Sequence, residues 1–305
     1  MSAFFPVDRR GFMQGAAAAL AAGSLPALGS ALAAETPKGF KKAVKWGMIQ
    51  VPGASVLDKF KLLKELGYDG VELDAPSKLD KDEVLAARDE TKLPIHGVVD
   101  SAHWNDTLSS ADPAVRASGV RALEQALRDS KLYGGTTVLL VPGKVERGKV
   151  SYADVYERSQ AEIRKVLPLA EELGIKIAFE NVWNDFLLSP LEEARYLDEF
   201  DSPFVGAYFD VGNVLRYGWP EEWIRVLGKR ILKVDIKEFS VAKMRNEGLG
   251  KGFGVELLEG DNNWPAVMAA FRDIGYQGWA TAEIPGGGRD RLAKIAGLMD
   301  KIFDS

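Results

Sequence analysis

Four carboxylate side chains stand at the ends of four separate apolar segments rich in strand-forming residues. They are Glu180 in IKIAFENVW, Asp210 in VGAYFDVGN, Asp235 in ILKVDIKEF and Glu283 in WATAEIPGG. Acids at the ends of buried strands are costly to desolvate, so a cluster of them calls for a cation or a polar substrate. The pattern predicts a metal-assisted active site with these four residues as ligands.

The alternative explanation is a set of structural ion pairs. Lys237 is the one lysine that the sequence places near the acids, and a single ammonium group does not balance four carboxylates. Four carboxylates and one divalent ion sum to a charge of −2, so we expect Lys237 or a protonated ligand to offset the excess. The charge balance therefore favours a metal site.

Composition limits both the metal and the chemistry. The 305-residue chain has 46% hydrophobic residues, a net charge of −5, no cysteine and two histidines, His96 and His103. This suffices for one large core, excludes thiol nucleophiles and disulfides, and argues against a nucleic-acid partner. A metal site must be mostly oxygen, which favours one divalent cation, preferably Mn²⁺, with Mg²⁺ or Co²⁺ as alternatives.

Short apolar runs alternate eight times with amphipathic segments beyond residue 40, which predicts parallel strands covered by helices. The runs cover residues 43–50, 70–74, 93–101, 136–143, 175–183, 204–212, 231–239 and 278–286. Eight such units match the size of a (β/α)₈ barrel. We predict an α/β fold, a single-domain TIM barrel, in preference to a doubly wound open sheet. Its active site is expected at the C-terminal strand ends, where the four acids stand.

The N-terminal segment has the features of an export signal. Arg9-Arg10 precedes a weakly apolar stretch, and Ala31-Leu32-Ala33 offers a small-residue cleavage site. We predict a twin-arginine signal peptide at 1–33 and a barrel at 34–305. The expected location is the periplasm, with the twin-arginine export machinery as a partner and no stable membrane anchor.

Residues near the strand ends supply further candidates for substrate binding. His103 and Trp104 follow the third strand, and Trp183 follows the fifth. Aromatic residues at barrel mouths either stack on sugars or pack internally, and the sequence leaves both open. His103 is a candidate for a substrate hydrogen bond or acid–base work, whereas His96 is expected in the core.

Two more features lie close to the predicted mouth. Glu72 ends the second strand and is expected to bind a substrate hydroxyl or to pair with Lys237. The glycine-rich stretch at 248–254 lacks the spacing of a phosphate loop, so we expect a flexible loop or lid over the mouth.

The sequence resembles the xylose isomerase-like barrel superfamily of sugar isomerases and epimerases, typified by tagatose 3-epimerase and hydroxypyruvate isomerase. The resemblance covers residues 40–303 and is carried by GYDGVEL, AFENVW, YFDVGN, KVDIKEF, LLEGDNNWPAVMAAFRDIGYQGW and TAEIPGG. It implies one divalent ion held by Glu, Asp, His and Glu, with the two glutamates moving protons. Glu180, Asp210 and Glu283 match three of these ligands.

Two positions depart from the family pattern. Asp235, in Asp-Ile-Lys-Glu, stands where the family usually has the histidine of His-x-Lys-Asp, and Asn213 stands where some epimerases carry a substrate-contacting histidine. We list Asn213 and Lys237 with the substrate-binding candidates.

The leading hypothesis is a periplasmic sugar isomerase or epimerase. It acts on an unphosphorylated ketose or keto-sugar through a metal-stabilised enediolate, with Glu180 and Glu283 as the catalytic acid–base pair. A 3-keto-glycoside lyase or hydratase using the same enolate chemistry is the alternative, and a non-catalytic periplasmic sugar-binding protein is the second. Endonuclease IV, which shares the barrel, is disfavoured because it needs several histidines. Homo-oligomerisation is left open.

Overall fold

The computed structural model describes residues 39–305, which form one closed barrel of eight parallel strands. The strands are β1 (Phe40–Lys45), β2 (Gly70–Ala75), β3 (Ile95–Asp100), β4 (Thr137–Leu140), β5 (Lys176–Glu180), β6 (Val205–Asp210), β7 (Ile231–Ile236) and β8 (Gly278–Ala282). Each strand pairs with its neighbour in chain order, and β8 pairs with β1 to close the barrel. The predicted TIM barrel is confirmed. The predicted signal segment at 1–33 lies outside the described residues.

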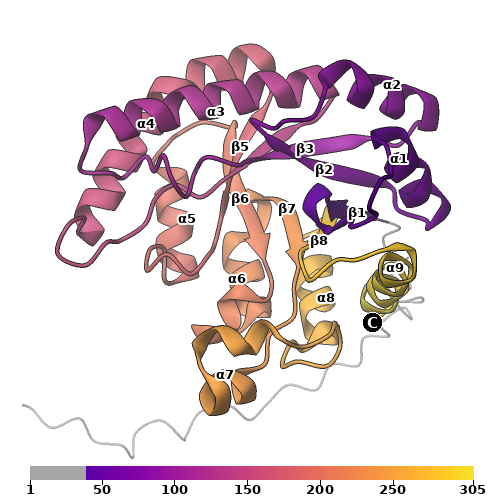
Figure 1. The fold of residues 1–305 in the computed structure, drawn as a ribbon. Coiled ribbons are helices and arrows are strands. Elements are labelled where there is room, and N and C mark those ends of the chain that lie inside the picture. The colour runs from indigo at the N-terminus through magenta and orange to yellow at the C-terminus, as the bar shows by residue number, and fades with distance from the viewer. Residues whose placement is uncertain (1–38) are drawn as a thin grey trace, which may run out of the picture. The chain divides into compact units, whose positions relative to one another are not determined.

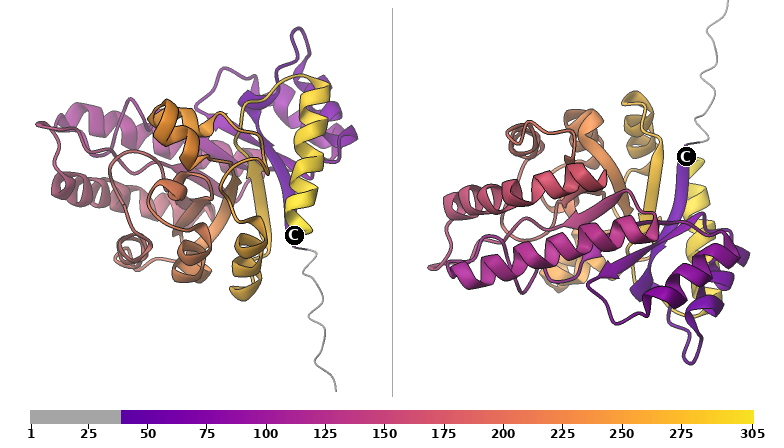
Figure 2. Two further views of the ribbon diagram at one scale, coloured as in Figure 1. Left: turned by 90° about the horizontal axis from the view of Figure 1, so that it is seen from below. Right: turned by 90° about the horizontal axis from the view of Figure 1, so that it is seen from above.

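Helices cover the outside of the strands (Figure 1). They are α1 (Val56–Glu65), α2 (Lys81–Thr91), α3 (Pro113–Tyr133), α4 (Tyr152–Leu173), α5 (Pro190–Asp198), α6 (Pro220–Leu227), α7 (Val241–Glu247), α8 (Trp264–Asp273) and α9 (Arg289–Phe303). The two longest, α3 and α4, lie side by side (Figure 2). None of the helices within residues 39–305 has the length and apolar character that a membrane span requires.

Local capping explains where several helices begin. Ser55 and Ser151 each accept a hydrogen bond from the third helical residue and complete a capping box. Ser189 also accepts the N–H of Glu192, but the Glu192 carboxylate bonds to the Leu188 N–H instead of returning to Ser189. Ser189 therefore caps the start of α5, but Ser189 and Glu192 do not form the two reciprocal hydrogen bonds of a capping box.

The first strand differs from the sequence prediction of 43–50, because β1 ends at Lys45 and a 3₁₀ turn, η1 (Trp46–Met48), follows. Met48 and Ile49 are buried, and Ile49 forms an isolated bridge with Gly287 beyond β8. The apolar run thus continues because these side chains pack into the large apolar cluster, not because the strand continues. As a consequence, Lys45 stands at the C-terminal end of β1.

The connection after β7 contains a helical insert. The glycine-rich stretch predicted as a flexible loop includes a 3₁₀ helix, η4 (Leu249–Phe253), which packs against α7. Gly252 also lets η4 approach Phe239 just before α7, because a Cβ at this position would lie 2.3 Å from the Phe239 ring. The prediction of a loop was therefore wrong for residues 249–253. The insert does reach the mouth of the barrel, where Phe253 lines the cavity above the acids.

Apolar packing occurs in two separate layers. A large cluster lies between the strands and the helices and includes Phe60, Phe209 and Phe271. A much smaller cluster consists of Leu139, Ala178 and Tyr208, with Val99 and Leu232 packed against it. Ala178 is two residues before Glu180, so it points into the barrel with that acid. The lumen is therefore largely polar.

Candidate active site

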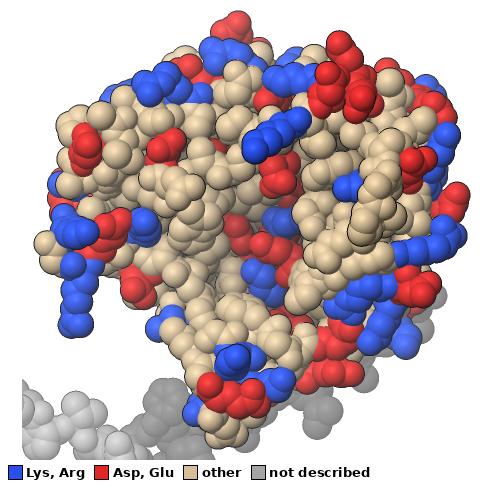
Figure 3. Space-filling model, viewed as in Figure 1, with Lys and Arg blue, Asp and Glu red and all other residues tan. Residues whose placement is uncertain are grey.

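The four predicted acids meet at one end of the barrel. Each offers a carboxylate oxygen, and these four oxygens lie within 4.8 Å of one another. They come from the C-terminal ends of neighbouring strands: Glu180 on β5, Asp210 on β6, Asp235 on β7 and Glu283 just after β8. Glu283 is partly exposed and the other three are buried. Figure 3 shows acidic and basic side chains at the floor of a hollow on the face seen in Figure 1.

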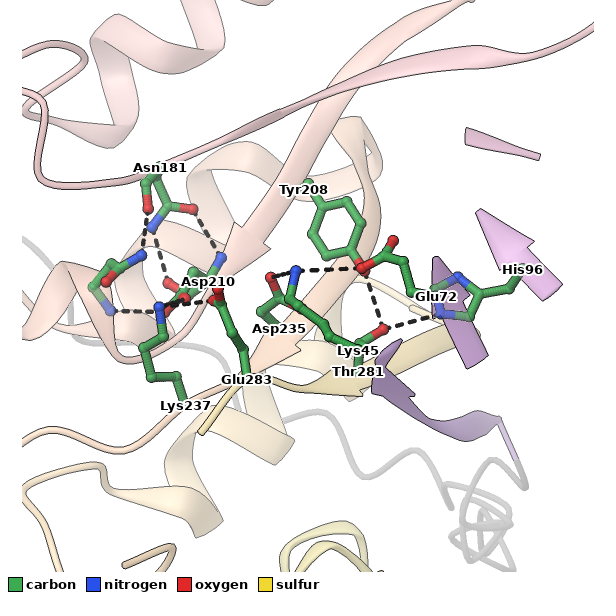
Figure 4. Close-up of polar contacts among 11 residues, drawn as sticks. Lys45, Glu72, His96, Asn181, Tyr208, Asp210, Asp235, Lys237, Thr281 and Glu283 are labelled. Atoms are coloured by element: carbon green, nitrogen blue, oxygen red, sulfur yellow. Dashed lines mark hydrogen bonds and ion pairs between the residues drawn. The ribbon is translucent and has the colours of Figure 1, made fainter. Parts of the chain in front are cut away.

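Lys237 bridges two of the acids (Figure 4). Its Nζ lies 2.8 Å from Oδ2 of Asp210 and 2.7 Å from Oε2 of Glu283. Burial disfavours the ammonium form, but these carboxylates outweigh that effect and raise the pKa of Lys237. Lys237 is therefore a fixed cation within the cluster.

Lys45 is a second lysine in the site, which the sequence analysis missed. Its Nζ lies 2.9 Å from Oδ2 of Asp235 and 3.2 Å from Oε2 of Glu72. Burial lowers the pKa of Lys45, yet the carboxylates, Asp235 foremost, raise it well above its usual value. The expectation that Lys237 is the one lysine near the acids was wrong, because Lys45 also pairs with one of them. The expected pairing of Glu72 with Lys237 was also wrong, because Glu72 lies directly opposite Lys45 in the β1–β2 ladder.

The protein environment shifts the pKa values of the clustered acids in different directions. Burial, reinforced by the charge of Glu283, raises the pKa of Glu180 well above its usual value. Burial also raises the pKa of Asp210, to about 6. At Glu283 the burial effect is outweighed by the ammonium groups of Lys45 and Lys237, which hold its pKa at about 2. Such divergent environments are typical of acid and base pairs in active sites.

Two asparagines fix the position of Asp210. The Asn181 side chain accepts the Asp210 N–H at 2.8 Å and donates to the Asp210 carbonyl at 2.9 Å. Asn213 donates its N–H to Oδ1 of Asp210 at 2.8 Å, and its side-chain amide donates to the Asn181 carbonyl at 2.9 Å. Asn213, predicted to contact substrate, is buried and holds the strand end in place. Asn181 was not predicted, although it follows Glu180 in the quoted motif.

A cavity of about 300 Å³ opens above the acids. Its lining consists of Trp104, Glu180, Val182, Trp183, Asn213, Lys237, Phe253 and Glu283. The Trp183 indole donates to the Asn213 carbonyl at 2.9 Å and packs against Phe239 and Phe253. Trp183 thus serves as both a packing residue and a wall of the cavity, and Phe253 of the helical insert supplies part of the same wall.

The two histidines occupy different places. His103 is buried, and its Nδ1 accepts the Val141 N–H at 3.2 Å, which leaves Nε2 as the position for the ring proton. Burial lowers its pKa to about 4, so His103 is neutral near pH 7. Its ring contacts Trp104 edge to face. His96 lies in the lumen below the acids, as expected for a core histidine.

A hydrogen-bonded chain runs through the lumen beneath the acids (Figure 4). The Tyr208 hydroxyl contacts both oxygens of Glu72, at 3.0 and 3.1 Å, and lies 3.0 Å from Oγ1 of Thr281. Thr281 lies 3.1 Å from Nε2 of His96, whose Nδ1 is 2.8 Å from Nζ of Lys233. Glu72 is fully buried in this chain and does not line the cavity, which removes it from the set of substrate contacts.

The cluster fits a divalent cation. Its four oxygens converge, and Oδ1 of Asp235 is buried without a hydrogen-bond partner among the described residues. Four carboxylates and the two lysines sum to −2, or to −3 with Glu72, so a divalent cation brings the group close to neutrality. An all-oxygen set from carboxylates suits a hard cation.

The chain belongs to the family described as Xylose isomerase-like TIM barrel, whose family model matches residues 60–302. The chain spans 66% and 53% of the length of the first two curated relatives that it matches. A further relative is L-ribulose-5-phosphate 3-epimerase of Escherichia coli O1:K1, which is 24% identical over 212 residues, or 66% of this chain and 74% of that protein. These relationships confirm the superfamily predicted from the sequence.

Solved structures give the same fold. A D-tagatose 3-epimerase-like protein superimposes with a TM-score of 0.72 at 19% identity, covering 87% of this chain and 97% of that one. The 3-keto-D-glucoside 4-epimerase of E. coli superimposes with a TM-score of 0.69 at 18% identity, covering 87% and 100%. Both likenesses confirm the barrel fold.

Proposed function

We propose that this protein is a divalent-metal-dependent sugar epimerase or isomerase that acts on an unphosphorylated ketose or keto-sugar. The observation that carries this proposal is the position of Glu180 and Glu283. They come from strands three places apart around the barrel and line one cavity, with the remaining acids beside them. The epimerase relatives support the same reaction class.

Proton transfer is the work of the two glutamates. Glu283 lines the cavity and lies 2.7 Å from the Lys237 ammonium group, and we assign to it the removal of a proton from the carbon beside a carbonyl. Glu180 lines the same cavity and is assigned the return of a proton to the same carbon or its neighbour. Return to the same carbon gives an epimer, and return to the neighbouring carbon gives an isomer.

The remaining residues position the substrate and the charge. Glu180, Asp210, Asp235 and Glu283 would hold a divalent cation, with Mn²⁺ preferred, which would supply positive charge beside the substrate oxygens. Trp104, Trp183 and Phe253 provide apolar walls against which a sugar ring can pack. These walls also limit the access of water to the reacting carbon.

The lining of the cavity favours an unphosphorylated substrate. Lys237 is the only cationic residue of residues 39–305 that lines it, and its ammonium group already contacts Asp210 and Glu283. A phosphate group would face the carboxylates of Glu180 and Glu283 without a lysine or arginine of the cavity lining free to bind it. A cavity of about 300 Å³ is also at the small end of ligand sites, which suits a single sugar unit.

Exchange with D₂O tests the proposal directly. The purified protein, loaded with Mn²⁺, is incubated in D₂O with a panel of ketoses and 3-keto-sugars, and products are followed by NMR. We expect deuterium at the carbon beside the carbonyl together with a new stereoisomer or positional isomer. Glu180→Gln and Glu283→Gln should each lower the rate by at least about 100-fold, whereas Glu222→Gln on the surface of α6 should not. Full activity in both site variants would refute the assignment.

A second candidate, cleavage of 3-keto-glycosides, is favoured by the fold shared with a 3-keto-D-glucoside 4-epimerase. The same proton abstraction followed by loss of a β-substituent releases an aglycone. Incubation with a 3-keto-glucoside that carries a chromophoric aglycone separates the two reactions. Release of the chromophore identifies a lyase, and a 4-epimer with the aglycone retained identifies an epimerase.

Export to the periplasm completes the proposal. Arg9-Arg10 and Ala31-Leu32-Ala33 support a twin-arginine signal at 1–33. A fusion of residues 1–40 to a reporter that is active only after export in the folded state should work, and Arg9→Lys together with Arg10→Lys should block it. Continued export of the double variant would contradict this route.

A further inference from the structure

A second, larger cavity lies at the other end of the barrel. Its volume is about 580 Å³, and it is lined by Gly39, Lys41, Thr136, Thr137, Gly174, Lys176, Leu232, Lys233, Gln277, Gly278 and Trp279. Lys176 and Gly278 are the first residues of β5 and β8, so this cavity faces the N-terminal strand ends. It is separate from the acids at the C-terminal ends.

Three lysines face this cavity and no acidic residue lines it. Side chains on a strand alternate, so Lys41 shares a face with Lys45, and Lys176 shares one with Glu180. Lys233 likewise shares a face with the acid two residues later in β7. The lumen therefore carries acids at one end and lysines at the other.

None of the three lysines has a carboxylate partner within 4.0 Å in the part of the chain that the structure describes, although many other lysines do. The net charge of the chain is −5, so a cavity with three cations and no acids departs from the general surface. Lys41 extends over the Trp279 ring at 5.3 Å. Such a concentration of uncompensated positive charge attracts anions.

Lys233 is the buried member of the group. It is 2% exposed, and its Nζ contacts the imidazole and the carbonyl of His96, neither of which carries negative charge. Gly97 leaves room for it, because a Cβ there would lie 2.9 Å from this Nζ. A buried ammonium group without a counter-ion is costly, so this side chain favours an anion nearby.

A neutral donor accompanies the lysines. The Thr137 hydroxyl is buried and has no hydrogen-bond partner among the described residues. Buried hydroxyl groups are nearly always bonded, so an unpartnered one beside a cavity points to a ligand or an ordered water. The Gln277 side chain, on the same cavity wall, offers an amide donor that could reach such a ligand.

We propose that this cavity binds a phosphate group, either as inorganic phosphate or as part of a small phosphorylated metabolite. Three lysines that line one cavity without a carboxylate partner suit a phosphate dianion, and lysine is a common phosphate ligand. The ligand would supply the counter-charge that no carboxylate provides for Lys41, Lys176 and Lys233. This site is independent of the proposed sugar chemistry, since it shares no residue with the cavity above the acids.

Isothermal titration calorimetry of the protein with inorganic phosphate is the test. We expect one site per chain, and at least about ten-fold weaker binding in each of Lys41→Met, Lys176→Met and Lys233→Met, because each loses a charged hydrogen bond. Lys64→Met, an exposed lysine of α1, is the matched control and should bind normally. Lys41 and Lys176 lie at the cavity edge, so their variants remain informative if Lys233→Met folds poorly.

Two comparisons define the outcome. Lys237→Met removes the lysine of the cavity above the acids and should leave phosphate binding unchanged. The proposal would be overturned if Lys237→Met lost phosphate binding while Lys176→Met and Lys233→Met kept it. No binding up to about 10 mM phosphate would overturn it as well. Ribose 5-phosphate distinguishes the ligand sources: equal affinity indicates inorganic phosphate, and at least ten-fold tighter binding indicates a metabolite.

Discussion

Lys45 at the end of β1 forms an ion pair of 2.9 Å with Asp235 on β7. The sequence motif led us to expect Asp235 in place of a histidine of the family pattern, and the ion pair sets a largely buried lysine beside this acid. Together with Lys237, this lysine keeps the carboxylates together before any cation binds.

Removal of Lys237 should make the protein depend on metal for stability. Lys237→Met leaves Asp210 and Glu283 adjacent without their counter-ion, so in EDTA we expect a loss of about 3 kcal/mol in the free energy of unfolding. Mn²⁺ should recover much of that loss, and more than it adds to the unmodified protein. Urea unfolding with EDTA or Mn²⁺ measures both effects, and Lys64→Met should behave as the parent. Equal stability of variant and parent in EDTA would contradict the prediction.

Asp235 should contribute directly to metal affinity. Asp235→Asn replaces a charged oxygen ligand with a neutral amide, so we expect Mn²⁺ to bind at least about ten-fold more weakly. Calorimetric titration with Mn²⁺ gives the value. Asp198→Asn, which changes an exposed acid paired with Arg230, should leave Mn²⁺ affinity unchanged. Unaltered Mn²⁺ affinity in Asp235→Asn would contradict this prediction and leave three carboxylates as the metal ligands.

The lumen chain should contribute measurably to stability through Tyr208. Tyr208→Phe removes the hydroxyl that bonds Glu72 and Thr281, and we expect a cost of about 2 kcal/mol because buried partners are left unsatisfied. Tyr217→Phe is a matched control, since the Tyr217 hydroxyl has no hydrogen-bond partner among the described residues. Chemical unfolding of the two variants should therefore differ. Similar costs would show that the chain adds little.

Glu193 in α5 should make stability fall as the pH rises. It is fully buried without a hydrogen-bond partner for its carboxyl among residues 39–305, and burial raises its pKa from 4.5 to about 8. The folded protein therefore binds a proton that the unfolded chain releases between these values, so its contribution to stability decreases from about pH 4.5 to pH 8.

Glu193→Gln should remove that dependence. We expect a gain of about 3 kcal/mol in the free energy of unfolding at pH 7 and almost none at pH 4.5. Urea unfolding at the two pH values is the measurement, with Glu222→Gln as the exposed control. A gain of equal size at both pH values would show that the ionisation of Glu193 is not its source.

The acids were predictable because each ends an apolar run and is followed by loop residues, and parallel strands in a barrel bring such ends together. Lys45 was not predictable in this way. The apolar residues Met48 and Ile49 extend the run beyond the true strand, so Lys45 was placed in its middle. Its pairing with Glu72 depends on the register between β1 and β2, which alternation alone does not determine.

Two other features also depend on tertiary packing. Asn213 lines the cavity, and its additional bonds to Asp210 and the Asn181 carbonyl arise only when β5 and β6 lie side by side. The stretch at 248–254 contains four glycines, which predicts a loop, yet its close contact with Phe239 favours helical turns. In both cases tertiary packing decides the local structure.

The division of apolar packing into an outer layer and a small lumen cluster has a consequence for how this chain can change. The residues that hold the helices to the strands are different residues from those of the small lumen cluster. Substitutions in the lumen cluster can therefore be made without changing the residues that pack the helices on the strands.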